Sequence, residues 1–190
     1  MTRRAFAAFT FFFCVSAQDF KLGSHVTNFS LQDVEGKKVS FDDLKGSVTV
    51  VTFISTICPI SNAYDDRMNA IYKDYSAKGV KFIFVNANSN ESPKEVQSHA
   101  KDVGFMFPVY KDVGNAAADQ FGASVTPESF VIDNSGIVRY HGQIDDSRNA
   151  ARVKVQGLRQ ALDAVLAGRA VDIKETKAFG CTIKRVRKTA

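Results

Sequence analysis

The sequence predicts an α/β protein built around one sheet of mixed strand direction, and three observations support this fold class. Residues 48–54 form a β-branched apolar run of the kind found in buried central strands. Apolar residues then recur at helical spacing, and such alternation of strands and helices is typical of parallel pairing. A later pair of short apolar segments around a turn predicts a hairpin, which adds antiparallel strands to the sheet.

The elements follow one another in this order. Strands are expected at residues 29–31, 38–41, 48–54, 80–85, 105–110, 129–132 and 137–140. Helices are expected at residues 59–78, 93–103, 115–121 and 153–166. The first two strands form an N-terminal β-hairpin, and the last two strands form a second hairpin ahead of the final helix.

Cap and turn residues set these boundaries. Pro59 is favoured at the first position of a helix, and Ser92 with Glu95 forms a capping box around the start of the next one. Gly79 and Gly104 are placed to end those two helices, since glycine readily adopts the left-handed conformation found there.

The first 17 residues predict a signal peptide. Arg3 and Arg4 supply the positive charge, residues 5–15 are apolar, and Val15-Ser16-Ala17 fits the small-residue cleavage rule. A buried N-terminal helix is disfavoured by the abrupt polar change at Gln18, and an uncleaved anchor by the short apolar stretch. We therefore expect an exported protein, periplasmic or extracellular, with no stable membrane insertion after cleavage.

The charge distribution does not predict a nucleic-acid partner. The formal net charge of +5 includes Arg3 and Arg4, so the chain without its signal would carry +3. Nucleic-acid binding calls for a broad basic face with interleaved aromatic residues, and no such pattern is visible. Four basic residues gather in the tail, where we expect a solvated end: Lys184, Arg185, Arg187 and Lys188.

Cys58 is the most informative residue, because it lies where the central strand ends and a helix should begin. At a helix N-terminus, unpaired N–H groups and the helix dipole favour a thiolate, which makes the thiol reactive. Ser61 stands where a C-x-x-C pair would have its second cysteine; its hydroxyl could hydrogen-bond the thiolate but could not resolve a mixed disulfide. The alternatives are a buried structural thiol and a metal ligand. No histidine lies at ligand spacing from Cys58, so we expect no metal and no cofactor.

Thr126-Pro127 directly precedes the strand at residues 129–132. An X–Pro bond can be cis, and a cis bond here would bring the Thr126 backbone close to a thiol at the first helix. A trans proline in a loop is the alternative.

Together these segments resemble the thioredoxin-fold redoxin superfamily, which includes the alkyl hydroperoxide reductase/thiol-specific antioxidant proteins. The resemblance covers residues 29–168 and rests on Phe29-Ser30-Leu31-Gln32-Asp33 with Gly36, the strand into Cys58-Pro59-Ile60-Ser61, Val125-Thr126-Pro127-Glu128, and Phe130-Val131-Ile132-Asp133 with Gly136. It implies a thioredoxin-like fold with an N-terminal β-hairpin. It also implies that Cys58 attacks a disulfide or a peroxide while Thr126-Pro127 presents backbone to the substrate.

Two departures place the chain in a peroxiredoxin-like branch with a Cys-Pro-x-Ser motif. Peroxiredoxins carry Pro-x-x-x-Thr/Ser-x-x-Cys; here Ser55 supplies the hydroxyl, but Val51 stands in place of the proline. Cys58 aligns with the first cysteine of the thioredoxin pair, whereas a peroxidatic cysteine would align with the second, which is Ser61.

Removal of the signal peptide with its Cys14 leaves Cys58 and Cys181. We divide the chain into the signal peptide (1–17), a thioredoxin-like redoxin domain (18–170) and a C-terminal extension (171–190) that carries Cys181. Cys181 could resolve a mixed disulfide if Phe179 and Gly180 dock the extension on the domain, since closing so long a loop costs little extra entropy. Alternatively, Cys181 is exposed and is free or pairs with another molecule.

The sequence thus predicts an exported thiol-dependent oxidoreductase in which Cys58 forms a mixed disulfide or a sulfenic acid. Its substrate would be a thiol or disulfide protein or a small peroxide, and an external thiol would reduce it. Supporting roles are predicted for Ser55, Asn62 and Glu128. The alternatives are a peroxiredoxin-type antioxidant peroxide reductase and a redox-inert binding module that uses the groove beside Pro127.

Overall fold

The computed structural model describes residues 22–187, so the predicted signal peptide and Cys14 lie outside the described residues. A seven-stranded mixed sheet has the order β2-β1-β5-β4-β3-β7-β8, and β6 pairs with β9 in a separate two-stranded sheet. The strands are β1 (Ser30–Gln32), β2 (Lys38–Ser40), β3 (Thr49–Phe53), β4 (Lys81–Asn86), β5 (Val109–Lys111), β6 (Val125–Thr126), β7 (Glu128–Ile132), β8 (Val138–Gly142) and β9 (Cys181–Thr182).

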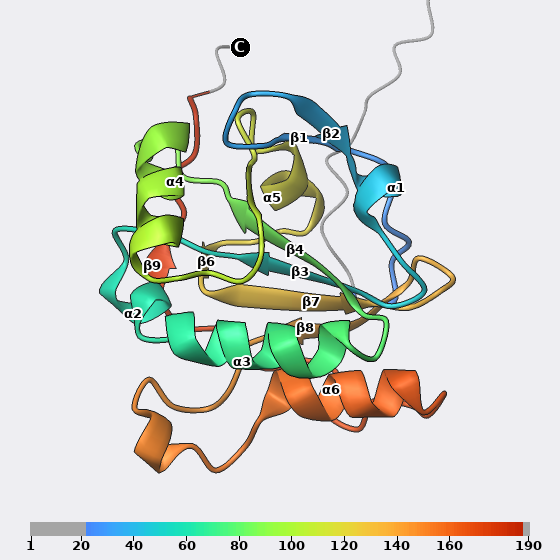
Figure 1. Ribbon diagram of the computed structural model, residues 1–190. Coiled ribbons are helices and arrows are strands. Elements are labelled where there is room, and N and C mark those ends of the chain that lie inside the picture. The colour runs from blue at the N-terminus through green and yellow to red at the C-terminus, as the bar shows by residue number, and fades with distance from the viewer. Residues whose placement is uncertain (1–21, 188–190) are drawn as a thin grey trace, which may run out of the picture.

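Helices cover both faces of the large sheet (Figure 1). They are α1 (Phe41–Leu44), α2 (Pro59–Asn62), α3 (Asp65–Ser76), α4 (Pro93–Asp102), α5 (Ala116–Gln120) and α6 (Gly157–Leu166), with a 3₁₀ turn at Ala150–Arg152. The predicted mixed sheet flanked by helices is confirmed, and so is the N-terminal hairpin, in which Leu31 pairs with Val39.

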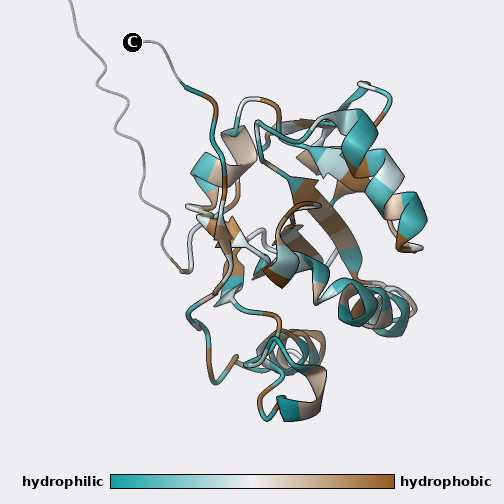
Figure 2. Ribbon diagram, turned by 90° about the vertical axis from the view of Figure 1, so that its left-hand side faces the viewer, coloured by the Kyte–Doolittle hydropathy of each residue, from teal (hydrophilic) through white to brown (hydrophobic). Residues whose placement is uncertain are grey.

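The core has two layers, one on each face of the sheet. Val50 of β3 packs with residues of α3, α4 and α6, whereas its neighbours Val51 and Phe53 face α1 and α5. This alternation follows from the period of two in a strand. Figure 2 shows the resulting arrangement, with hydrophobic strands enclosed by helices that carry hydrophilic residues outward.

The prediction of one continuous helix from Pro59 to the glycine at position 79 was wrong, because the helix is interrupted after its first turn. α2 ends at Asn62 and α3 begins at Asp65. At the break the Tyr64 N–H bonds to the Ser61 carbonyl, three residues back, at 2.9 Å. Tyr64 is buried, and its hydroxyl donates to the Asp145 carbonyl at 3.5 Å. The final helix also begins later than expected, at Gly157, because the 3₁₀ turn precedes it.

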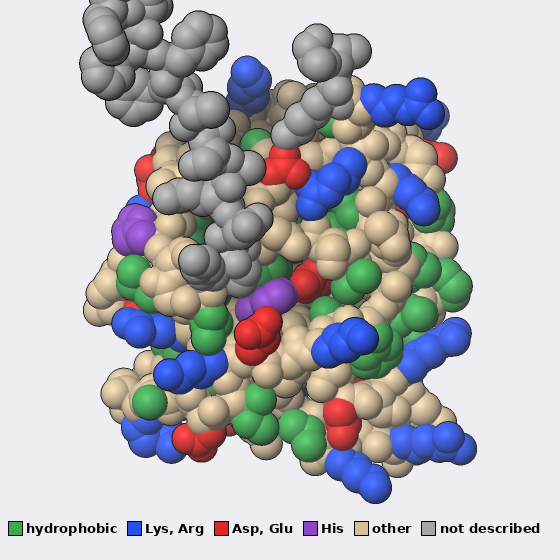
Figure 3. Space-filling view, turned by 180° about the vertical axis from the view of Figure 1, so that it is seen from behind, with side chains coloured by type: hydrophobic (Ala, Val, Ile, Leu, Met, Phe, Trp, Pro, Cys, Tyr) green, Lys and Arg blue, Asp and Glu red, His purple; other side chains and the backbone are tan. Residues whose placement is uncertain are grey.

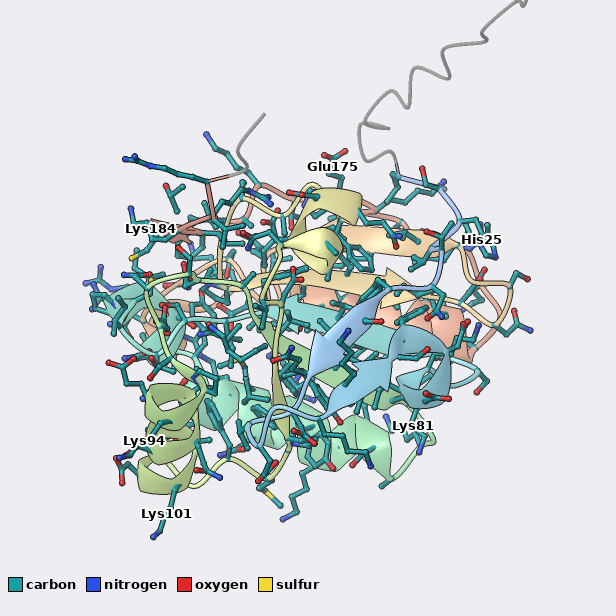
Figure 4. The ribbon with its side chains drawn as sticks, turned by 90° about the horizontal axis from the view of Figure 1, so that it is seen from above. His25, Lys81, Lys94, Lys101, Glu175 and Lys184 are labelled. Atoms are coloured by element: carbon teal, nitrogen blue, oxygen red, sulfur yellow. The ribbon has the colours of Figure 1, made fainter. Side chains whose placement is uncertain are left out.

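The C-terminal strap, residues 174–187, docks its backbone on the domain, while Lys184, Arg185 and Arg187 remain exposed as expected and Lys188 lies outside the described residues. It begins beside β8, where Thr176 N–H donates to the His141 carbonyl at 3.0 Å, and then supplies β9 (Figure 1). Arg185 donates to the Ala123 carbonyl at 2.5 Å and forms an ion pair with Asp119. Figure 4 labels Glu175 and Lys184, which mark its course along one side of the molecule. On the face seen in Figure 3, Lys and Arg side chains are dispersed among acidic ones.

Among residues 22–187, no helix combines the length and the apolar character that crossing a bilayer would require.

Candidate functional site around Cys58

Cys58 is the N-cap of α2 and follows the end of β3. Its side chain is buried, with 1% of the residue exposed. The thiol donates to the Thr126 carbonyl oxygen at 3.4 Å, and Sγ accepts the Ser61 N–H at 3.4 Å. The backbone of two separate segments therefore holds the sulfur in place.

Thr126-Pro127 is a cis peptide bond, one of the two isomers that the sequence left open. Thr126 belongs to β6, and its antiparallel partner in β9 is Cys181. Because Thr126 contacts Cys58 and pairs with Cys181, the two cysteines are neighbours. Both are free thiols, and each shifts the pKa of the other.

The two thiols have opposite pKa shifts. Burial raises the pKa of Cys58, but the Cys181 side chain, the backbone N–H groups of Ser61 and Cys181, and the Thr126 side chain together outweigh it, so the pKa is lowered. The pKa of Cys181 is raised, chiefly by the Cys58 side chain and secondly by burial. Cys58 is therefore the thiol that ionises first, and Cys181 is its proton-bearing partner.

The short length of α2 changes the physical reason for the lowered pKa of Cys58. α2 has a single turn, and the break at Tyr64 separates it from α3. The field of a long helix therefore contributes less than the sequence implied, because the macrodipole needs aligned peptide units. The Ser61 N–H and the Cys181 side chain act locally instead.

Ser61 and Asn62 lie beside Cys58 but make other contacts than predicted. The hydroxyl oxygen of Ser61 accepts the Ser55 N–H at 3.1 Å, so Ser61 reaches the sulfur through its backbone. The Asn62 side-chain amide donates to the Thr56 carbonyl at 2.9 Å, away from the thiol. Both side chains brace the loop between β3 and α2.

Ser55 belongs to a hydrogen-bond network centred on Glu91, a residue that the sequence did not single out. The Ser55 hydroxyl accepts the Cys58 N–H at 3.2 Å and donates to Glu91 Oε1 at 2.6 Å. Glu91 is 3% exposed, and its Oε2 accepts from the Thr56 N–H and the Thr56 hydroxyl, both at 2.6 Å. Glu91 therefore fixes the backbone that leads into Cys58.

The segment after β4 connects this network to the strap. Asn88 Oδ1 accepts the Lys184 N–H at 2.7 Å, while buried Lys111 donates to the Asn88 and Glu91 carbonyls at 2.9 and 2.6 Å. Burial lowers the pKa of Lys111. The sequence did contain a pattern that could have pointed to this segment. β4 is the parallel neighbour of β3, so the polar residues that follow β4 lie at the same edge of the sheet as Cys58.

Glu128 takes a different place from the one predicted. One carboxylate oxygen accepts the N–H groups of Ser124 and Val125 at 2.7 and 3.2 Å, and the other contacts His141 Nε2 at 2.6 Å. Its carboxylate thus positions β6 and Thr126 rather than contacting Cys58.

Known proteins with similar sequences point to the same family. The model of the AhpC/TSA family matches residues 22–141. The thiol-disulfide oxidoreductase ResA of Bacillus thuringiensis (strain Al Hakam) is 33% identical over 126 residues, which are 66% of this chain and 72% of that protein. ResA of Bacillus subtilis (strain 168) is 33% identical over 61% of this chain and 64% of its own.

Solved structures agree. The crystal structure of an uncharacterized conserved protein from Geobacillus kaustophilus has a TM-score of 0.82 at 32% identity, covering 90% of this chain and 96% of its own. A protein of Sinorhizobium meliloti 1021 has a TM-score of 0.81 at 31% identity, with 90% and 98% covered. Peroxidoxin BcpB from Mycobacterium tuberculosis, at 20% identity, 80% and 100% coverage and a TM-score of 0.64, shares the fold. The chain belongs to the AhpC/TSA family and has the thioredoxin-like fold that its sequence predicted.

Proposed function

We propose that this protein is a thiol–disulfide oxidoreductase whose redox couple is Cys58 and Cys181. The observation that carries the proposal is the pairing of β6 with β9, which seats Cys181 next to the buried Cys58. The oxidoreductase relatives named ResA support the reaction class.

The reaction proceeds in two exchanges. The Cys58 thiolate attacks one sulfur of a substrate disulfide, forms a mixed disulfide and releases the other sulfur as a thiolate, which takes up a proton from solvent. The Cys181 sulfur, after losing its proton to solvent, attacks Cys58 Sγ. This step forms the Cys58–Cys181 disulfide and releases the second substrate sulfur as a thiolate. The substrate is reduced by two electrons, and an external dithiol or two thiols reduce the protein again.

The surroundings of Cys58 suit this role. The Ser61 N–H and the Cys181 side chain stabilise the negative sulfur, and the lowered pKa of Cys58 raises the fraction of the nucleophilic form. Thr126 offers its backbone carbonyl beside the sulfur, and Pro127 is buried behind it. Export to an oxidising compartment remains part of the proposal, and it rests on the N-terminal sequence.

Two alternatives have weaker support. For a peroxide reductase, the Ser55 hydroxyl should face the sulfur, yet it bonds to the Cys58 N–H and to Glu91. A redox-inert binding module gives no reason for a second thiol opposite Thr126, the residue whose carbonyl contacts Cys58.

The test uses the full-length chain with Cys14→Ser as the parent and adds Cys58→Ser or Cys181→Ser to it. Each of the three proteins is assayed for reduction of a protein disulfide such as insulin, with dithiothreitol as the reductant. Cys58→Ser should abolish activity above the rate of dithiothreitol alone. Cys181→Ser, incubated with insulin before any dithiothreitol is added, should retain the first exchange and accumulate a mixed disulfide at Cys58, visible by intact mass. Undiminished activity of Cys58→Ser would rule the proposal out. Consumption of hydrogen peroxide far faster than by a free thiol would favour the peroxidase instead.

A further inference from the structure

The strap covers the site that the proposed reaction needs. Cys58 is 1% exposed while Gly180 and Cys181 lie on the backbone of Thr126. Thiol–disulfide exchange requires the incoming sulfur to approach Cys58 Sγ directly. A substrate therefore cannot reach Cys58 until this part of the strap moves.

What occupies the site is an extended strand, and its contacts define what can replace it. Residues 179–183 run antiparallel to β6, with Cys181 opposite Thr126 and the Ile183 N–H donating to the Ser124 carbonyl at 2.9 Å. Backbone pairing with a strand edge is a general way to bind a polypeptide, with side-chain positions adding specificity.

The position of Gly180 is where the site on β6 most strictly limits the size of the residue that it can accept. A Cβ added to Gly180 would lie 1.9 Å from the Thr126 carbonyl oxygen and 2.6 Å from its carbonyl carbon. Both atoms belong to the backbone, so a side chain there cannot be accommodated by a rotamer change. The residue that precedes the cysteine must have no side chain if the strand is to lie against Thr126.

The strap is held more firmly on either side of this segment than within it. On one side, the Thr176 hydroxyl contacts the Tyr140 hydroxyl at 2.9 Å; on the other, Ile183 is buried in the core. Between them Lys177 and Thr182 are exposed, and Phe179 is half-buried against the Tyr64 ring. The middle of the strap can therefore separate from β6 while its flanks stay docked.

Resting on the proposed function, we propose that residues 179–182 are a tethered occupant of a substrate-strand site on β6, held by Ile183 as the docked flank on its C-terminal side. An extended polypeptide segment with glycine directly before its reactive cysteine takes their place. Binding and reaction are thereby coupled. The substrate strand binds β6 as β9 leaves it. When β9 returns, Cys181 attacks Cys58 and the reduced segment is released. The electron balance is that of the proposed reaction.

The test uses the full-length chain with Cys14→Ser and Cys181→Ser, so that Cys58 is the reacting thiol. Gly180→Ala in this background should push the strap away from Thr126. The matched control is Gly114→Ala, since a Cβ at Gly114 meets no atom within 4 Å. Phe179→Ala is a second opening variant that introduces no clash.

The probes are two peptides with the sequences Ala-Phe-Gly-Cys-Thr-Ile-Lys and Ala-Phe-Ala-Cys-Thr-Ile-Lys, each with its cysteine in a disulfide with thionitrobenzoate. Ellman's reagent serves as the small disulfide. Release of thionitrobenzoate measures attack by Cys58, and intact mass identifies the mixed disulfide.

We expect the glycine peptide to react about tenfold faster or more with Gly180→Ala than with Gly114→Ala, because overpacking shifts the population toward the open strap. Phe179→Ala should accelerate the reaction in the same direction. In the opened variants the glycine peptide should outpace the alanine peptide, whereas Ellman's reagent should gain less than the glycine peptide.

Equal rates for Gly180→Ala and Gly114→Ala would overturn the tethered strap, and equal rates for the two peptides would overturn the strand site. A different result marks failure of the proposed function itself. Cys58 would then be inert to Ellman's reagent in every folded variant and reactive only after unfolding in urea.

Discussion

Cys181 is the strand partner of Thr126, and the Thr126 carbonyl oxygen accepts the thiol hydrogen of Cys58. One backbone position thus connects a nucleophile near the start of the domain to a second thiol near its C-terminus. Stability, ionisation and reactivity of this protein should all respond to the docking of the strap.

Removing the Cys181 side chain should move the ionisation of Cys58 to higher pH. The Cys181 side chain is the largest of the hydrogen-bond contributions that lower the pKa of Cys58, whereas burial alone would raise it. In Cys181→Ala, the thiolate should therefore appear at higher pH than in Thr182→Ala, the exposed neighbour used as control. The ultraviolet absorbance of the thiolate as a function of pH measures the shift. Coincident titration curves would contradict this role of Cys181.

Oxidation should stabilise the fold. A Cys58–Cys181 disulfide would close a loop longer than ~100 residues, for which the chain-entropy account gives about 5 kcal/mol and a melting temperature about 10–20 °C higher. Thermal melting of oxidised and reduced protein checks this expectation. Cys181→Ser should melt at one temperature under both conditions, and a disulfide that destabilises the protein would mean that the strap must distort to form it.

Glu91→Gln should weaken the loop that carries Cys58. The carboxylate of Glu91 accepts hydrogen bonds from Ser55, Thr56 and Asn86, and a neutral amide cannot serve all these donors. We expect a loss of about 1–3 kcal/mol in the free energy of unfolding, measured by urea denaturation. Glu35→Gln, at an exposed position, is the control. A loss no larger than that of the control would show that the network is dispensable.

Ile183→Ala should loosen the strap at its C-terminal anchor. Ile183 is 4% exposed and packs in the core layer that includes Phe121, so truncation leaves a cavity worth about 2–4 kcal/mol. Ile173→Ala removes the same atoms from a side chain that is 52% exposed and should cost little. Urea denaturation measures both, and alkylation of Cys58 should be faster only in Ile183→Ala. Slow alkylation in both variants would mean that the strap stays closed without this anchor.

Much of the fold follows from local patterns in the sequence. The β-branched run before Cys58, the proline after it and the capping box at Ser92 and Glu95 each specify their own element, because their signals lie within a few residues. The strand–cysteine–proline–helix junction could therefore be assigned as the candidate site without coordinates. The break at Tyr64 could not, because burial of that side chain overrides a continuous helical pattern.

What the sequence by itself determined is thus the junction at Cys58, the two hairpins and the alternation that makes a mixed sheet. Tertiary structure decided which residues surround the thiol. β6 and β9 have two residues each, too few for any periodic signal, and their pairing joins segments far apart in the chain. Glu91 reaches Cys58 only because β4 lies parallel to β3. Long-range backbone pairing leaves no local trace, and so the neighbour of Cys58 emerges only when the chain is folded.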